Sequence, residues 1–238
     1  MYHPGSHVFL ATDSASIVRL QAFNISNIIV YTYPLMNEYS GLGRSRLESE
    51  NLFLKLLSVK MDILRISLSK FSDSLYLDSD VFLLNPVCVD PTSELMLSYS
   101  YISQKLQNDV GIFNAGYLWT SSIQFVEEWK DQLMNSKYYD QHILQELCIN
   151  YKHSFFDAAH NIMPWRLLTP IKSKEDFLGS LSVENTFVLI NGKKMISIHT
   201  HLNRPDFSEF NKIILKMLFN ACHTNGLTIV DHINFRNR

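Results

Sequence analysis

Strand-like and helix-like segments alternate at the start of the chain, and this alternation limits the possible fold more than any other feature. The segments "HVFLAT" and "NIIVYTYP" are short apolar runs typical of strands, and "DSASIVRLQAF" between them has helical periodicity after a polar cap. Strands that alternate with helices usually form a parallel sheet with helices on both faces. The sequence therefore predicts an α/β fold.

The same alternation continues along the rest of the chain. Further helices are expected in "NLFLKLLSVKMDILRISLSKF", "SSIQFVEEWKDQL" and "QHILQELCIN", and further strands in "SDSLYLDSDVFLLNP", "IFNAGYLWT" and "KMISIHTHL". The polar segment "MNEYSGLGRSRLESE" contains two glycines and is expected to be a loop. No linker divides the chain, so we expect a single domain over 1–238 with a C-terminal helical tail at about 206–238.

Composition excludes several classes of protein. A chain of 238 residues with 46% hydrophobic residues can bury the core of one domain. Its net charge of −2 leaves no basic excess for a nucleic-acid backbone, so no nucleic-acid partner is expected. The three cysteines are far apart and show no metal-binding spacing, which favours reduced thiols in the cytoplasm.

Membrane association is expected at most at the surface. The first residues carry neither a basic leader nor a long apolar run, and no segment reaches the ~20 apolar residues of a membrane-spanning helix. The tail "FSEFNKIILKMLFNACHTNG" has an apolar helical stripe, which core packing explains most simply. Peripheral membrane contact through this stripe is the alternative.

Two carboxylates stand in the middle of an apolar segment, "LYLDSDVFLL". Side chains alternate across a strand, so Asp78 and Asp80 are expected on one face, about 7 Å apart. Two carboxylates this close repel each other unless a cation or hydrogen-bond donors lie between them. Their oxygen atoms suit Mg²⁺ or Mn²⁺, and the simpler alternative is that both acids lie in water at a strand end.

A late strand carries two histidines. In "KMISIHTHLNRP", alternation places His199 and His201 on one face together with Ser197, opposite to Ile196 and Ile198. Neutral imidazole is a ligand for Mn²⁺, so either histidine could complete a site that the carboxylates begin. The pattern does not choose between them.

Two further polar residues have both a structural and a functional interpretation. Asn114 is poorly suited to the apolar strand "IFNAGYLW" unless it holds a bulge or turn, or points its amide at a ligand. Asp140 opens the helix of "YYDQHILQE", where an ordinary N-cap is the simplest explanation.

The order of "LYLDSDVFLLNP", "FNAGYLW", "DQHILQ", "HNIMPW" and "SIHTHLNRP" resembles the glycogenin-like family of retaining glycosyltransferases, especially bacterial lipopolysaccharide galactosyl- and glucosyltransferases. The resemblance runs from "ATD" near the start to "NRP". It implies a GT-A fold, a Rossmann-like mixed and mostly parallel sheet flanked by helices. It also implies transfer of a hexose from a UDP-sugar with the help of Mn²⁺ or Mg²⁺.

The resemblance also implies roles for individual residues around the metal. Asp78 and Asp80 match the metal-binding DxD motif, with Asp78 also near the donor ribose. His199 matches the late metal ligand, with His201 as a substitute. Arg204 stands where the family has a lysine at the diphosphate.

Other matches concern the nucleotide and the sugar. Thr12 and Asp13 lie where the family's first strand meets the nucleotide base, and Lys60 lies near a basic residue that approaches the donor phosphates or sugar. Asn114 would face the donor sugar or the acceptor. Asp140 and Gln141 would lie beside the reacting anomeric carbon.

Two segments depart from the family pattern. His142 stands where the family has a second acid after Asp140, so a contact to sugar hydroxyls is lost or changed. The late motif lacks the family's glycine and tryptophan, which alters closure over the diphosphate.

We therefore expect a cytoplasmic, UDP-sugar-dependent hexosyltransferase, either free or peripheral to a membrane, with a saccharide, glycolipid or protein acceptor. Two other functions fit parts of the sequence. A haloacid dehalogenase-type phosphatase would use Asp78 as nucleophile and Asp80 as acid. A catalytically degenerate sugar-nucleotide-binding protein would explain the altered late motif.

Overall fold

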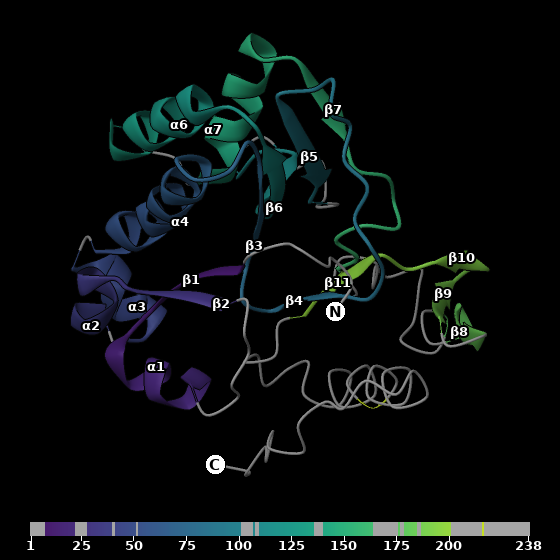
Figure 1. Ribbon diagram of the computed structural model, residues 1–238, viewed down its shortest axis with the longest axis horizontal. Helices are drawn as coiled ribbons and strands as arrows, with labels where there is room; N and C mark the ends of the chain where they lie inside the picture. The colour runs from purple at the N-terminus through teal and green to yellow at the C-terminus, as the bar shows by residue number, and fades with distance from the viewer. Residues whose placement is uncertain are drawn as a thin grey trace. The chain divides into compact units, whose positions relative to one another are not determined.

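The computed structural model describes residues 8–21, 28–39, 41–50, 52–100, 107, 110–135, 140–163, 176, 179–184, 187–200 and 216. The protein is mixed α/β, as expected (Figure 1). It forms two compact units. The first contains the described residues of His3–Leu77 and Val89–Phe156, and the second contains those of Asp78–Cys88 and Asp157–Arg238. The single domain expected over 1–238 stays a prediction.

The first unit begins with the expected strand, helix and strand. These are β1 (Val8–Thr12), α1 (Ser14–Gln21) and β2 (Ile28–Thr32), and the two strands are parallel neighbours. Asp13 caps α1, because its Oδ1 accepts a hydrogen bond from the backbone N–H of Ser16 at 2.8 Å. The chain therefore turns from strand to helix at a capping carboxylate.

The segment expected to be a loop contains two short helices instead, α2 (Pro34–Tyr39) and α3 (Arg44–Ser49). Proline suits the first helical position, and α2 ends before Gly41, whose φ of +78° favours glycine. In α3, Arg46 Nε donates to Glu50 Oε1 at 2.7 Å. The polar composition and the glycines hid both helices from the sequence pattern.

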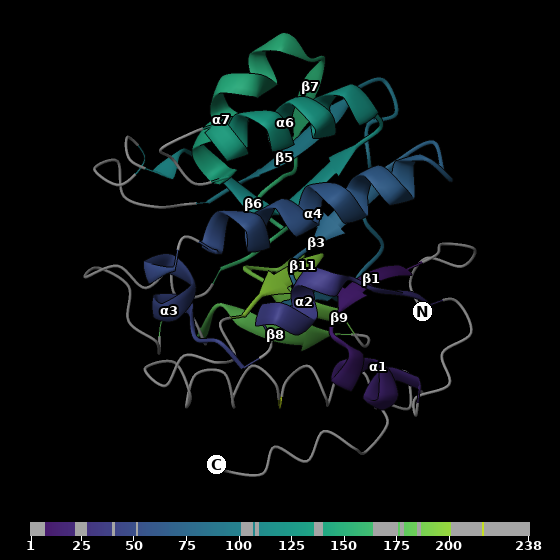
Figure 2. The ribbon, with the colours of Figure 1, turned by 90° about the vertical axis from the view of Figure 1, so that its left-hand side faces the viewer.

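A four-stranded sheet is the centre of the first unit, in the order β3-β6-β5-β7. Figures 1 and 2 show the larger helices α4, α6 and α7 on one side of this sheet. Their bounds confirm the helices expected in this region and the strand expected in "IFNAGYLWT", whereas β5 and β7 were not predicted from the sequence. The elements are α4 (Phe53–Leu68), β3 (Ser74–Leu77), β5 (Leu95–Tyr99), β6 (Phe113–Thr120), α6 (Ile123–Asn135), α7 (Asp140–Leu147), the 3₁₀ turn η1 (Cys148–Asn150) and β7 (His153–Phe155).

The apolar faces of these helices and strands form the main core. Trp129 and Leu133 of α6 are completely buried, as is Leu144 of α7. They pack with residues of the sheet such as Leu97 and Leu118. Removal of this apolar surface from water stabilises the arrangement that places α7 next to β6.

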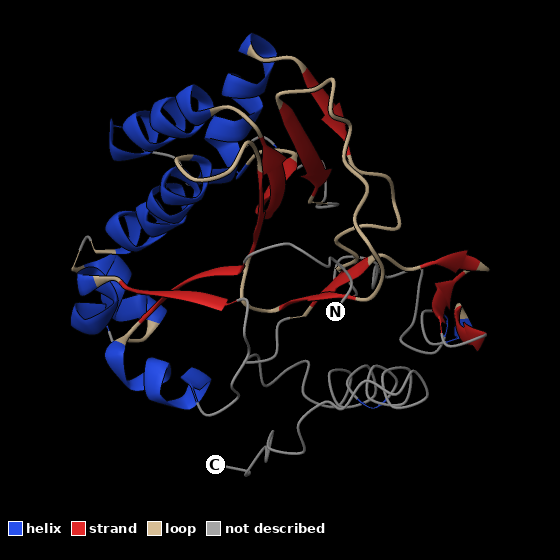
Figure 3. Cartoon of the chain, viewed as in Figure 1, coloured by secondary structure: helices blue, strands red, loops and turns tan. Residues whose placement is uncertain are grey.

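The described residues of the second unit include several short strands, drawn in red in Figure 3 like the other strands. An antiparallel pair joins β4 (Val81–Leu83) to β11 (Ser197–His199), and a three-stranded sheet has the order β10-β9-β8. The strands of this three-stranded sheet are β8 (Leu181–Glu184), β9 (Phe187–Ile190) and β10 (Lys193–Lys194). A smaller apolar core contains Ile162, Val188, Met195 and Ile198.

The strand pairing is mixed, and the expectation of a mostly parallel sheet is wrong for the described strands. Within the described ranges, β1–β2 and β5–β7 are parallel, whereas the pairs β3–β6, β5–β6, β4–β11, β8–β9 and β9–β10 are antiparallel. In the described chain, only Asn191 and Gly192 connect β9 to β10, and a connection this short favours antiparallel pairing.

The expected tail at about 206–238 lies outside the described residues, except for the exposed Lys216. Its apolar stripe and any membrane contact stay predictions. Of the helices that the structure describes, none is both long and apolar enough to cross a lipid bilayer.

Candidate functional site

The two central carboxylates lie on a turn between two strands, which corrects the expectation of one continuous strand. β3 ends at Leu77 and β4 begins at Val81, whose backbone N–H donates to the carbonyl oxygen of Asp78 at 3.1 Å. Asp78 therefore opens a tight turn, and Asp80 is its third residue. The two acids are therefore close together because they lie in the same turn, and not because side chains alternate along a strand.

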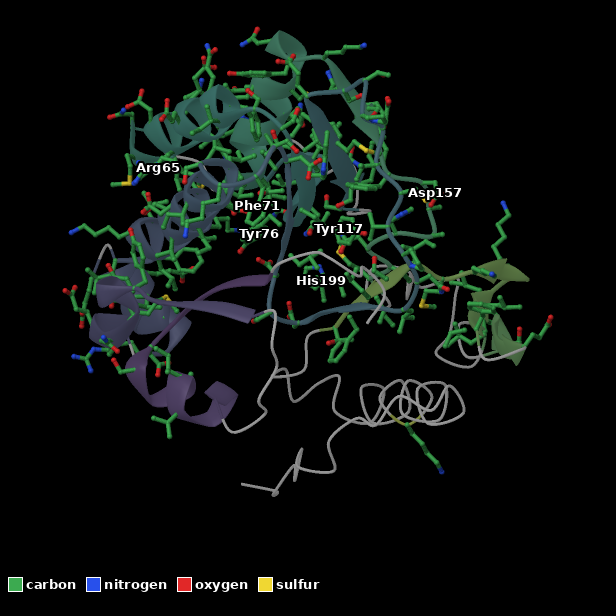
Figure 4. The ribbon with its side chains drawn as sticks, viewed as in Figure 1. Arg65, Phe71, Tyr76, Tyr117, Asp157 and His199 are labelled. Atoms are coloured by element: carbon green, nitrogen blue, oxygen red, sulfur yellow. The ribbon has the colours of Figure 1, made fainter. Side chains whose placement is uncertain are left out.

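Pairing between β4 and β11 brings the late histidine to this turn. His199 lies opposite Val81 in the antiparallel register, one residue from Asp80 (Figure 4). The backbone N–H and the hydroxyl of Thr200 both donate to the Asp80 carbonyl oxygen, at 2.8 and 3.0 Å. This backbone contact fixes the acidic turn against the end of β11.

Asp78, Asp80 and His199 form a candidate metal centre within the second unit. Each offers one ligand atom, and the three atoms lie within 4.8 Å of one another. His199 is buried, with 3% of its surface exposed, and the two acids are half-buried. In the part of the chain that the structure describes, no other group of three or more His, Cys, Asp or Glu side chains meets this geometry.

The chemistry of this donor set fits a divalent cation. Two carboxylate oxygens and one imidazole nitrogen suit Mn²⁺, and carboxylates with water suit Mg²⁺. His199 Nε2 lies 3.1 Å from Asp80 Oδ1, and its other nitrogen, Nδ1, lies 3.0 Å from the amide oxygen of Asn161. A proton on Nδ1 leaves the lone pair of Nε2 directed toward the acid.

The segment beside Asn161 is also tightly bonded. His160 Nδ1 lies 2.7 Å from Asp157 Oδ1, and the Ala159 backbone N–H donates to the same oxygen at 2.9 Å. Burial tends to raise the pKa of the Asp157 carboxyl, but the hydrogen bonds from His160 and Ala159 outweigh it, and the pKa is lowered. Asp157, which is labelled in Figure 4, thus holds the turn that precedes Asn161 through these two hydrogen bonds.

A second polar cluster lies in the first unit and joins residues far apart in the sequence. Lys60 of α4 donates from Nζ to Asp140 Oδ2 of α7 at 2.5 Å, and both side chains are about nine-tenths buried, with 10% and 8% exposed. Lys60 also lies 5.4 Å from the centre of the Tyr76 ring. Asp140 is the first residue of α7, and its side chain forms an ion pair with Lys60. The simplest interpretation of the sequence, an ordinary helix cap, did not include this ion pair.

Asn114 belongs to the same cluster through a bulge in β6. The register between β5 and β6 shifts between Leu97 and Tyr99, and the backbone N–H of Gly116 donates to Asn114 Oδ1 at 3.0 Å. The amide nitrogen of Asn114 points to Gln141 Oε1 at 3.4 Å. Asn114 therefore holds the bulge, which was one of its two interpretations, and also reaches the residue after Asp140.

The start of α7 is fixed by close packing. Trp129 donates from its indole N–H to the Asp140 carbonyl oxygen at 3.0 Å. Gly111 has a φ of +85°, and a Cβ atom at this position would lie 2.7 Å from the Gln141 carbonyl oxygen. Only glycine allows this approach, so Gly111 sets the position of both predicted catalytic residues.

His142 departs from the family pattern and has a partner of its own. Its Nε2 lies 3.4 Å from Glu146 Oε1, one helical turn further along α7. The side chain of Glu146 is largely exposed.

The structure brings most of the predicted site residues into these two groups. Asp78, Asp80 and His199 form one group, and Lys60, Asn114, Asp140 and Gln141 form the other. Asp13 caps α1, and Thr12 ends β1. His201 and Arg204 lie outside the described residues.

Sequence reasoning missed three supporting residues: Asn161, Thr200 and Gly111. Asn161 was present in the segment "HNIMPW", but nothing in the sequence pattern linked its amide to His199. Gly111 acts through backbone geometry, and Thr200 acts through hydrogen bonds to a backbone carbonyl oxygen; neither contact leaves a motif in the sequence.

Comparison with known proteins adds no family assignment. No protein-family model matches the sequence, and no curated protein matches it.

Proposed function

We propose that the protein is a metal-dependent glycosyltransferase that moves a hexose from a UDP-sugar to an acceptor hydroxyl, with the GT-A fold that the sequence resemblance implies. The observation that carries the proposal is the convergence of Asp78, Asp80 and His199. A DxD turn with a buried histidine beside it is a donor set for a divalent cation that binds a diphosphate.

Asp78, Asp80 and His199 would hold the Mn²⁺ or Mg²⁺ ion. The bound cation supplies Lewis-acid stabilisation of the negative charge that develops on the leaving diphosphate. Asp78 also accepts a hydrogen bond from the donor ribose. Arg204 adds positive charge at the diphosphate, and Thr12 and Asp13 contact the base.

The family resemblance assigns the residues of the other cluster to the sugar. Asp140 lies 2.5 Å from Lys60, so its carboxylate is compensated in a buried environment. As the bond from sugar to diphosphate breaks, Asp140 or Gln141 stabilises the cationic anomeric carbon, or acts transiently as nucleophile. Asn114 orients a sugar hydroxyl. The family resemblance supports retention of the anomeric configuration.

The acceptor is a saccharide, a glycolipid or a protein, and the reaction is expected in the cytoplasm. A tail that contacts a membrane would suit a glycolipid acceptor.

Hydrolysis of UDP-glucose and UDP-galactose tests the proposal, because transferases of this kind release UDP slowly in the absence of acceptor. We expect UDP release with Mn²⁺ and none with EDTA. Asp80→Asn should abolish this release and leave the far-UV circular dichroism unchanged. Asp73→Asn is the matched control, since Asp73 is exposed and lies shortly before β3.

The other two functions are outcomes of the same test. Hydrolysis of p-nitrophenyl phosphate that depends on Asp78, without UDP release, would indicate the haloacid dehalogenase-type phosphatase. Tight binding of UDP-sugars without turnover in the presence of acceptor sugars would indicate a degenerate binding protein. Full UDP release by Asp80→Asn would remove the metal assignment.

A further inference from the structure

The candidate ligand His199 has a buried partner on the side away from the acids. Its Nδ1 lies 3.0 Å from Asn161 Oδ1, while its Nε2 lies 3.1 Å from Asp80 Oδ1. Asn161 is completely buried, with 0% exposure, and His199 is 3% exposed. Neighbours on both sides therefore set the orientation of the imidazole ring.

The backbone holds Asn161 rigidly against β11. Its N–H donates to the Ser197 hydroxyl at 2.7 Å. The next residue, Ile162, donates to the Ser197 carbonyl oxygen at 3.1 Å and accepts from the His199 N–H at 2.9 Å. Asn161 has a φ of +50°, a left-handed conformation that asparagine adopts more readily than most residues.

The contact with Asn161 decides which nitrogen of a neutral imidazole carries the proton. An amide oxygen can only accept, so the Nδ1 atom that faces it must donate. Nε2 then has a lone pair, which lies 3.1 Å from an acceptor oxygen of Asp80. The Nε2 lone pair and the Asp80 oxygen are then two acceptors close together, an arrangement that favours a cation between them. A histidine that binds a metal must offer such a lone pair.

An opposite orientation of the amide makes the contrary prediction. If the Asn161 amide nitrogen faced His199, Nδ1 would accept, Nε2 would carry the proton, and that proton would point at Asp80. His199 would then be a hydrogen-bond donor to the acid and a poor metal ligand. The two orientations can therefore be distinguished by the position of one proton.

We propose that Asn161 is a positioning residue that accepts the Nδ1 proton of His199 and thereby presents the Nε2 lone pair to a divalent cation at Asp78 and Asp80. This inference rests on the metal site of the proposed function. It assigns to Asn161 a role that no sequence motif revealed, and it explains why a buried asparagine in a left-handed conformation lies beside a ligand.

The first readout is the His199 tautomer in the metal-free protein, measured by ¹⁵N NMR of the imidazole nitrogens, with His199→Gln to assign its signals among the nine histidines. We expect the proton on Nδ1 in the wild type and in Asn161→Asp, which keeps only acceptor oxygens. We expect Asn161→Gly, which loses the amide and tolerates the backbone conformation, to lose this preference.

The second readout is Mn²⁺ affinity by isothermal titration calorimetry. Loss of an outer partner of a ligating histidine typically weakens metal binding about 10- to 100-fold, and we expect this for Asn161→Gly. Asn161→Asp should stay close to the wild type. Two controls should also stay close: Asn191→Gly, an exposed asparagine with a φ of 49°, and Asn85→Ala, a buried asparagine whose amide nitrogen donates to the Met195 carbonyl oxygen at 2.6 Å.

The outcomes separate this inference from the proposed function. A proton on Nε2 in the wild type, or unchanged tautomer and Mn²⁺ affinity in Asn161→Gly, would overturn the role of Asn161. If the wild type shows the Nδ1 proton and Asn161→Gly loses it, but neither binds Mn²⁺, the positioning by Asn161 holds and the metal-dependent function is wrong.

Discussion

At the scale of single residues, the structure gives a position to one of the two candidate histidine ligands. His199 lies with its Nε2 atom 3.1 Å from Asp80, whereas His201 lies outside the described residues. If His199 is the ligand, His199→Ala should weaken Mn²⁺ binding strongly, and His201→Ala should leave it unchanged. Calorimetric titration of both variants measures this. Equal affinity in both would remove β11 from the metal site.

The buried pair between Lys60 and Asp140 makes a second prediction at this scale. Lys60→Met leaves the Asp140 carboxylate buried without its cation, which typically destabilises a protein by about 3–5 kcal/mol. The double variant Lys60→Met/Asp140→Asn removes the stranded charge and should recover part of this loss. Urea unfolding measures the free energy of unfolding of each variant.

An exposed ion pair gives the matched control for Lys60. Arg46→Met removes the pair with Glu50, whose side chains are 66% and 42% exposed, and we expect no measurable change in stability. Wild-type stability in Lys60→Met would contradict the burial of the pair.

At the scale of elements, the position of α7 depends on a glycine in the preceding segment. Gly111→Ala adds a methyl group 2.7 Å from the Gln141 carbonyl oxygen in a left-handed backbone conformation. The conformation alone costs about 1–3 kcal/mol, and the clash must also move the start of α7. We expect loss of stability together with loss of UDP release, because Asp140 and Gln141 move with the helix.

Gly41→Ala separates the two costs. Gly41 has a similar φ of +78°, but a Cβ atom there meets nothing within 4 Å. Its free energy of unfolding should fall by the conformational cost alone, and UDP release should persist. Equal losses in both variants would show that the approach of Gly111 to α7 has no importance of its own.

The long amphipathic elements could be predicted from the sequence because their pattern extends over several turns. The strand, helix and strand at the start, the helix α4 and the helices α6 and α7 are all confirmed. The helices α2 and α3 were missed because each is only 6 residues long, too short for a periodic pattern to stand out.

The break at Asp78 was also hidden, since apolar residues flank the turn on both sides and resemble one strand. Sequence nevertheless identified Asp78, Asp80 and His199, because acids and a histidine in apolar strands are unusual. The pairing of Lys60 with Asp140 could not be derived, because it joins residues separated by 80 positions and depends on the packing of both α4 and α7 against α6.

At the scale of the whole molecule, stability should fall at high pH because of a half-buried phenol, that of Tyr33. The Tyr33 hydroxyl donates to Asp62, whose other oxygen accepts from Lys130 at 2.6 Å. Burial and the hydrogen bond to Asp62 raise the pKa of Tyr33 from 10.0 to about 12. The unfolded chain therefore loses this proton before the folded protein does.

The sign of the effect follows from proton binding. The contribution of Tyr33 is fully present below pH 10.0, the value for the unfolded chain, and is lost as the pH rises toward about 12. Urea unfolding between pH 8 and pH 11 should show a steeper decline for the wild type than for Tyr33→Phe. Parallel curves for the two proteins would contradict the buried hydrogen bond to Asp62.

We propose that the acidic turn and His199 hold a cation for a nucleotide diphosphate. The most direct test is calorimetric titration of UDP and UDP-sugars into the protein with Mn²⁺ and again with EDTA. We predict tight binding that requires Mn²⁺ and is lost in Asp80→Asn. Absence of nucleotide binding in both conditions, or equal affinity with EDTA, would contradict the claim.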